Sequence, residues 1–361
     1  MWIGAAPCVF AQEHAAAPLA EKPVAEKPRA KTLARPAGRP RAPLSTAACP
    51  PTALGTERRL IIGSKGGLAL GLKTYPQTLD LADHEVVLTF DDGPWPGTTP
   101  QVLDALARQC VKATFFLIGR NAAAAPWLVR REIAEGHTLG HHTFSHPAAT
   151  LRGVPDAVAR RDIDKGFAAD DEAAYGQAAA EPRVPFFRFP GFADTPELVS
   201  WLERRNIAIF GADLWASDWL MMTPQAELHL VLERLEAQKG GILLLHDTRR
   251  ETARMLPDLL VELKKRGFKI VHLVPGTDMP ALRQAPKGWT SETEAIIRQV
   301  DPKLAEPKVS EPKLAEPKFA EPKPALPEPA TPQPPAAHDF TQPDAAAEQS
   351  HGQVAPAETG K

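Results

Sequence analysis

Between residues 85 and 274, short apolar segments alternate with stretches that have helical character. Each apolar segment is apolar throughout rather than at every second residue, which is typical of parallel strands covered on both faces. Thr-Pro pairs at Thr99, Thr195 and Thr223 mark predicted helix starts. The pattern predicts an α/β fold with a closed or nearly closed parallel barrel, or alternatively an open doubly wound sheet. The seven predicted strands span residues 85–90, 112–119, 137–142, 185–190, 207–214, 242–247 and 268–274.

Composition separates this region from two tails. Of the 38 prolines, 22 lie before residue 59 or after residue 300, whereas only four of the 23 aromatic residues lie there. We therefore expect one domain at residues 59–300, since that region holds nearly all the material for a core. Residues 1–12 resemble a degraded export signal, with a plain disordered N-terminus as the alternative. Residues 13–58 are predicted to be a disordered, basic, Ala/Pro-rich tail, and residues 301–361 a second disordered tail.

The second tail begins with five tandem copies of an acidic-Pro-Lys-x-x unit, "DPKLA EPKVS EPKLA EPKFA EPKPA". Proline at every fifth residue forbids a continuous helix, so this stretch is predicted to be extended and semi-rigid. We interpret it as a spacer or as an arm that contacts the cell wall or a partner. The formal net charge of −2 gives no reason to expect nucleic-acid binding. No apolar run is long enough for a membrane span.

Polar side chains gather where the predicted strands end. Because parallel strands of a barrel present their carboxyl ends at one rim, these side chains should lie close together. Five of the seven strands deliver residue types used in catalysis, a coincidence that stability alone does not require. The residues concerned are Asp91, Asp92, His141, His142, His146, Arg188, Asp213, Asp218, Trp219, His246 and Asp247.

Two histidines and a carboxylate form a common catalytic metal set. His142 and His146 are four residues apart, and Asp92 completes the set. His141 competes with His142, but adjacent side chains of an extended segment point in opposite directions. The three cysteines have no Cys-x-x-Cys spacing, so a cysteine-based zinc site is not expected, and they leave the redox compartment open.

The remaining rim residues supply acid and base groups. Asp91 is adjacent in sequence to the metal ligand and is the candidate general base, while His246 is the candidate general acid. Arg188 is placed to hold Asp91 ionised, and Asp218 is placed to orient and charge His246.

The segments "TFDDGP", "HHTFSHP", "RFPG", "SDW" and "LLLHD" follow one another in this order. Over residues 84 to 275 they resemble the five motifs of the polysaccharide deacetylase family, a carbohydrate esterase family also known by its NodB homology domain. The resemblance implies a distorted seven-stranded (β/α)7 barrel and a divalent metal, usually zinc, with cobalt or manganese as alternatives. It implies the same ligand, base and acid residues, with Arg188 steadying the base and Asp218 tuning the acid. Substrate-binding residues would be Trp219, Leu244 and Pro190.

Two positions depart from the family pattern. The second motif usually has Asn where His141 stands, and the fourth usually has Asp where Trp215 stands. Asp213 is a candidate replacement for that Asp, or is unrelated to it.

We expect a metal-dependent hydrolase that removes N-acetyl groups from a glycan containing N-acetylglucosamine, such as peptidoglycan, a chitin-like polymer or an exopolysaccharide. Removal of O-acetyl esters is the alternative within the enzymes. A catalytically silent glycan-binding protein is the alternative outside them. The glycan is the expected partner, and the expected location is periplasmic or secreted.

Overall fold

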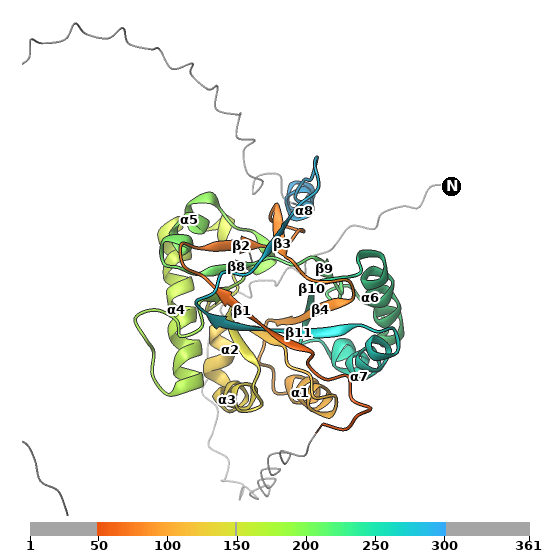
Figure 1. Cartoon of the computed structure of the whole chain (residues 1–361). Coiled ribbons are helices and arrows are strands. Elements are labelled where there is room, and N and C mark those ends of the chain that lie inside the picture. Colours follow the sequence, from red (N-terminus) through yellow and green to blue (C-terminus); the bar gives the residue numbers. More distant parts are fainter. Residues whose placement is uncertain (1–48, 149, 301–361) are drawn as a thin grey trace, which may run out of the picture. The chain divides into compact units, whose positions relative to one another are not determined.

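The computed structural model describes residues 49–148 and 150–300. The predicted export signal, most of the first predicted tail and the whole of the second lie outside these residues. The elements alternate between strand and helix through the centre of the chain, as expected (Figure 1). The strands are β1 (Arg58–Gly63), β2 (Leu68–Leu70), β3 (Gln77–Leu79), β4 (Glu85–Asp91), β5 (Thr114–Leu117), β6 (Thr138–His141), β7 (Phe186–Phe187), β8 (Ala208–Phe210), β9 (Leu214–Trp215), β10 (Gly240–His246), β11 (Lys269–Gly276) and β12 (Leu282–Gln284). The helices are α1 (Thr99–Arg108), α2 (Gly119–Ala124), α3 (Pro126–Ala134), α4 (Asp156–Tyr175), α5 (Pro196–Arg204), α6 (Pro224–Gln238), α7 (Arg250–Lys265) and α8 (Glu292–Val300).

A mostly parallel sheet forms the centre of the fold, and helices α1 to α7 lie around it (Figure 1). Parallel pairs join β9, β10, β4, β5, β6, β7, β8 and β2 in that order. The prediction of an α/β fold with parallel strands is confirmed. The predicted fifth strand, however, is divided into β8 and β9. The run of pairs ends at β9 on one side and at β2 on the other, and no ladder among the described residues joins these two, so the barrel is open between β2 and β9.

Alternating side chains of each strand face two different cores. Leu243 and Leu245 of β10 belong to the core that α1, α6 and α7 cover, whereas Ile242 belongs to the core enclosed by the curved sheet. On β4, Val87 also belongs to the enclosed core. Because side chains two residues apart point to the same face, Val87 is followed on that face by Thr89 and then Asp91 at the strand end.

Polar side chains hold the segment that joins β8 to β9 and bridge the open seam between β2 and β9. The Arg188 guanidinium donates hydrogen bonds to the carbonyl oxygens of Phe210, at 3.1 Å, and Gly211, at 2.9 Å. The Asp213 carboxylate accepts hydrogen bonds from the backbone N–H of Leu72 and Ile242, both at 2.9 Å. Asp213 therefore ties neighbouring segments together where no ladder does, and among the described contacts it has none with His246.

The seventh predicted strand, β11, is not a simple neighbour of β4. It pairs with β4 only through Lys269 and Ile270, at the amino end of β4, and then pairs with β1 along its length. The Thr138 hydroxyl, at the start of β6, donates to the carbonyl oxygen of Leu273 in β11 at 2.6 Å. The β1–β11 pair thus lies across the amino ends of the central strands, the opposite edge from the predicted site.

All three predicted Thr-Pro helix starts are confirmed. Thr195 and Thr223 accept hydrogen bonds from the backbone N–H of Leu198 and Ala226, respectively, at the starts of α5 and α6. The third start differs only in its cap: Thr99 is the first residue of α1, Thr98 is the N-cap residue, and the Thr99 hydroxyl donates to Asp247.

Residues before the predicted boundary at residue 59 pack against the domain. Cys49 and Cys110 form a disulfide with a Cα–Cα distance of 5.9 Å. The backbone N–H groups of Leu54 and Gly55 donate to Gln109 at 2.9 and 2.8 Å. The structured part therefore begins by Cys49, ahead of the boundary that composition predicted, because composition does not register which cysteines meet in space.

We expect the Cys110→Ser variant to lose roughly 3–4 kcal/mol of unfolding free energy, because the disulfide closes a long loop and restricts the unfolded chain. Urea denaturation with and without reductant measures the loss. Reductant should destabilise the unmodified protein and leave the variant unchanged. The control is Cys8→Ser, which should respond to reductant like the unmodified protein. Equal stability with and without reductant would contradict a disulfide in the folded protein.

Near the C-terminal end of the described region, residues 285–300 pack on the loop between β2 and β3. The Trp289 indole N–H donates to the carbonyl oxygen of Leu72 at 2.8 Å, and the backbone N–H of Thr293 donates to that of Lys73 at 3.0 Å. Lys73 lies 5.0 Å from the centre of the Trp215 ring. Within the residues that the structure describes, every helix is too short or too polar to cross a membrane.

Candidate active site

The sequence Asp91-Asp92-Gly93-Pro94 brings two adjacent carboxylates to one rim. Asp91 is the last residue of β4, and the next residue, Asp92, has a φ of 75°. This left-handed conformation turns the chain, so Asp92 does not continue the alternation of the strand. A side chain at position 93 would collide with the Asp247 carboxylate, so only glycine fits there.

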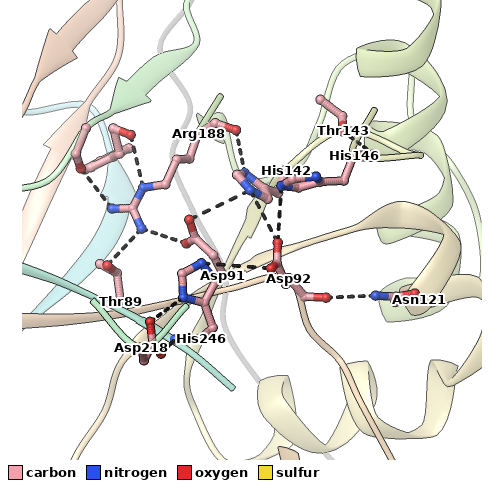
Figure 2. A network of polar contacts seen from close by, with 12 residues as sticks. Thr89, Asp91, Asp92, Asn121, His142, Thr143, His146, Arg188, Asp218 and His246 are labelled. Carbon is pink, nitrogen blue, oxygen red and sulfur yellow. Dashed lines mark hydrogen bonds and ion pairs between the residues drawn. The ribbon is translucent and has the colours of Figure 1, made fainter. Parts of the chain in front are cut away.

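Asp92, His142 and His146 meet at the predicted metal position. The Asp92 Oδ1 atom lies 3.6 Å from His142 Nε2 and 3.5 Å from His146 Nε2. One ligand atom from each of the three residues lies within 4.8 Å of the other two, and Figure 2 shows the three side chains pointing toward one another.

Hydrogen bonding and burial prepare His142 and Asp92 to bind a cation. His142 donates from Nδ1 to the carbonyl oxygen of Arg188 at 2.8 Å, which leaves Nε2 without a proton toward Asp92. Burial lowers the pKa of His142 to about 4, so its ring is neutral at pH 7. Asp92 Oδ1 is buried and has no hydrogen-bond partner among the described residues. A buried carboxylate oxygen without a partner, beside two imidazole nitrogens, fits a bound divalent cation.

His141 lies apart from this group. It is the last residue of β6, is fully buried, and its Nδ1 lies 2.8 Å from the Asp170 carboxylate on α4. The alternation of an extended segment therefore separates His141 from His142, as expected. His141 stabilises the packing of α4 on the sheet.

Asp91 lies between Arg188 and the ligand histidines. Arg188 donates to Asp91 Oδ1 at 2.7 Å and to Thr89 Oγ1 at 2.9 Å. The other oxygen, Asp91 Oδ2, lies 3.9 Å from His142 Nε2. Arg188 is fully buried, and its guanidinium also donates to the carbonyl oxygens of Phe210 and Gly211. It therefore holds the Asp91 carboxylate in one orientation beside the predicted metal ligands.

His246 lies across the rim from the ligand histidines, at the end of β10, and Asp218 holds it (Figure 2). Its Nδ1 donates to Asp218 Oδ1 at 2.7 Å, and its backbone N–H donates to Asp218 Oδ2 at 2.7 Å. The Nε2 atom lies 3.9 Å from Asp92 Oδ2. Burial, the largest single effect, lowers the pKa of His246, but the carboxylates of Asp218, Asp92 and Asp91 together outweigh burial and raise it to about 10. His246 can therefore carry a proton on the nitrogen that faces the site.

The predicted substrate-binding residues are found at the same rim, with differing exposure. The Trp219 ring is 40% exposed and lies 6.1 Å from the His246 ring, measured between centroids. Leu244 is buried in a small cluster with Phe192 and Trp215. Pro190 is buried at the start of a short 3-10 helix that follows Arg188.

Sequence reasoning missed residues that support the site from outside the motifs. Asn121, in α2, donates to the carbonyl oxygen of Asp92 at 2.8 Å. Thr252, in α7, donates to the Asp218 carboxylate and also contacts Glu227 of α6. No local pattern identifies these residues, because each lies in a helix outside the motifs and acts through a contact with a residue elsewhere in the sequence.

Comparisons with known proteins agree with this geometry. The family model "Polysaccharide deacetylase" matches residues 79–205. A peptidoglycan-N-acetylglucosamine deacetylase of Listeria monocytogenes is 33% identical over 191 residues, which are 53% of this chain. The match spans only 38% of the length of that relative. A chitooligosaccharide deacetylase of Sinorhizobium fredii is 33% identical over 215 residues, which cover 56% of this chain and 95% of the relative.

The fold is similar to solved structures as well. A peptidoglycan deacetylase of Bdellovibrio bacteriovorus is 26% identical and superposes with a TM-score of 0.53, covering 71% of this chain and 64% of the other. A peptidoglycan N-acetylglucosamine deacetylase structure is 28% identical, with a TM-score of 0.50 over 61% of this chain and 95% of the other. The match to the Sinorhizobium relative spans nearly the whole length of that relative, and the family model and the similar fold agree with it. The chain therefore belongs to the polysaccharide deacetylase family.

Proposed function

We propose that this protein is a metal-dependent hydrolase that removes N-acetyl groups from a glycan containing N-acetylglucosamine and releases acetate. The observation that carries the proposal is the meeting of Asp92, His142 and His146 between a carboxylate, Asp91, and an imidazole, His246. The names of the Listeria and Sinorhizobium relatives support this substrate class. Peptidoglycan, a chitin-like polymer and an exopolysaccharide are all glycans of this class.

Asp92, His142 and His146 would hold the cation, most simply zinc, since zinc accepts two imidazoles and a carboxylate and leaves positions open. A cation held by these residues would supply Lewis-acid polarisation of the carbonyl and would make the attacking water easier to deprotonate. Asp91 accepts the proton of the attacking water, and Arg188 keeps its carboxylate aimed at the site.

His246 completes the reaction by protonating the leaving nitrogen. An amine leaves an amide only with a proton, whereas an alcohol leaves an ester more readily, so a proton donor at His246 suits the removal of an N-acetyl group. Trp219 and Leu244 would form the wall that receives the acetyl methyl group, with Pro190 nearby. The exposed Trp219 ring offers an apolar face to the sugar.

An acetate-release assay tests the proposal. The purified protein is incubated with N-acetylated glycans and with O-acetylated glycans, with and without added zinc. We expect acetate from the N-acetylated glycan only, at a rate that depends on metal. Acetate from the ester alone would support the O-acetyl alternative, and binding of glycan without release would support the silent binding protein. The control is heat-inactivated protein with added zinc.

We propose a periplasmic or secreted location. The Cys49–Cys110 disulfide supports it, because disulfides persist in oxidising compartments. A substrate in the cell wall, of the kind that the relatives' names give, lies in the same compartments.

Removing residues 1–48 and 301–361 should change turnover on a soluble oligosaccharide by a factor of about three or less. The reason is that the candidate site lies wholly between Asp91 and His246, within the described domain. Turnover of the full chain and of the truncated protein is compared on a soluble oligomer and on an insoluble polymer. A folded truncation without activity on the oligomer would contradict this proposal. Loss on the insoluble polymer alone would indicate that a tail contacts the polymer.

A further inference from the structure

We propose that Glu227 is a positioning residue for His246: it carries a proton and donates a hydrogen bond to Thr252, whose hydroxyl then donates to Asp218. The inference rests on the proposed function in that His246 is taken as the general acid. Glu227 lies in the first turn of α6, is fully buried, and lies outside every motif of the family resemblance. It reaches the site through a chain of side chains, Glu227 to Thr252 to Asp218 to His246.

Each link of the chain is a short contact between buried groups. Thr252 Oγ1 lies 2.9 Å from Glu227 Oε1 and 2.9 Å from Asp218 Oδ2. Asp218 Oδ2 also accepts from the His246 backbone N–H at 2.7 Å, and Asp218 Oδ1 accepts from the His246 ring at 2.7 Å. Thr252 has no exposed surface, so water does not replace either carboxylate as its partner.

Counting protons shows that one carboxyl group must be neutral. A threonine hydroxyl has a single hydrogen and donates only once. If both carboxylates were ionised, one of the two contacts would bring lone pairs of two oxygens together without a hydrogen. A proton on Glu227 resolves this, because Glu227 then donates to Thr252 and Thr252 donates to Asp218.

The proton belongs on Glu227 rather than on Asp218. Burial raises the pKa of Asp218, but the charge and hydrogen bonds of His246 outweigh burial and leave the pKa lowered. Glu227 has no such partner. The charged groups that act on it are Asp218, Glu251 and His246, and burial, the largest effect, raises its pKa to about 7. The Glu227 Oε2 atom has no hydrogen-bond partner among the described residues, which is less costly for a neutral carboxyl than for a carboxylate.

Proton loss from Glu227 should weaken catalysis in two ways. Asp218 would lose its hydrogen bond from Thr252 whenever the hydroxyl turns to Glu227, so the orientation of His246 would loosen. A second buried negative charge would also hold the proton more tightly on His246, which makes the imidazolium a weaker acid toward the leaving nitrogen. The rate should therefore fall as the pH rises through about 7, where Glu227 loses its proton.

The test compares Glu227→Gln with Glu227→Leu in the full chain, loaded with zinc. The Gln amide donates to Thr252 and does not ionise, so kcat at about pH 6 should stay within about threefold, and the decline near pH 7 should disappear. The Leu side chain has no hydrogen-bond donor, so kcat should fall by about tenfold both at about pH 6 and above pH 7, while KM is unchanged. The control is Glu233→Gln, the same charge change on the same helix at an exposed position. Its pH profile should match that of the unmodified protein.

A second measurement does not depend on activity. Carbon-13 labelling of glutamate side-chain carboxyl groups should give one resonance, absent from Glu227→Gln, that is protonated at about pH 6 and titrates near pH 7. A Glu227 resonance that is already ionised at pH 6 overturns the proposal, as does a Glu227→Gln profile identical to the unmodified one. If the unmodified protein releases no acetate from any glycan, the proposed function fails, and the resonance still decides whether Glu227 carries the proton.

Discussion

Replacing Asp91 with Asn should lower kcat by roughly 100-fold or more while the protein keeps its metal. Asn has the shape of Asp and still offers an oxygen to Arg188, which donates to this position at 2.7 Å. It does not accept a proton from water, so the base is lost and the geometry is retained. Asp91 does not belong to the group of three ligand residues, so metal binding should persist. Steady-state kinetics and the metal content of the purified variant measure the two effects.

The matched control for this prediction is Asp247→Asn. Asp247 is also a buried carboxyl group at a strand end, but its side chain bonds to Thr99. Burial raises its pKa to about 7, so the neutral amide resembles a state that Asp247 already populates. We expect a much smaller loss of kcat for this variant. Near-normal activity of Asp91→Asn with unchanged metal would show that the base lies elsewhere.

The sequence was sufficient to predict that the candidate site residues lie close together, because parallel strands place their carboxyl ends at one edge. The apolar runs before Asp91, His141 and His246 identified three strand ends, and the residues that follow them were predicted to meet. The alternation of an extended segment also separated His141 from His142. These predictions depend on local patterns and on one topological rule, both of which can be seen in sequence.

Other parts of the structure depend on contacts that no local pattern records. Strands of two or three residues, such as β2 and β9, are too short to show periodicity. The opening between β2 and β9 is bridged by Asp213, and Arg188 holds the end of β8, each through hydrogen bonds to backbone atoms distant in sequence. Asp213, a candidate replacement for a motif carboxylate, accepts hydrogen bonds from backbone N–H groups at the seam.

Asp92→Asn should weaken metal binding severely, because an amide carries no charge to offset that of a divalent cation. The Asp92 Oδ1 atom lies within 3.6 Å of both ligand histidine nitrogens and has no hydrogen-bond partner of its own among the described residues. Removing its charge therefore affects the cation first. We expect the metal dissociation constant to rise by about 100-fold or more, and excess zinc to restore part of the rate. Metal content after dialysis and a zinc titration of activity measure these effects.

The comparison of His142→Ala with His141→Ala is the control for the ligand assignment. The two residues are adjacent, both are buried, and burial lowers the pKa of both rings, so the substitutions remove the same chemical group from similar surroundings. His142 directs Nε2 at Asp92, whereas His141 contacts Asp170. His142→Ala should therefore lose bound metal, and His141→Ala should keep it and lose thermal stability. The opposite result, with metal lost only from His141→Ala, would mean that the register of the segment after β6 differs by one residue. It would also contradict the assignment of Asp92 and His146 as ligands.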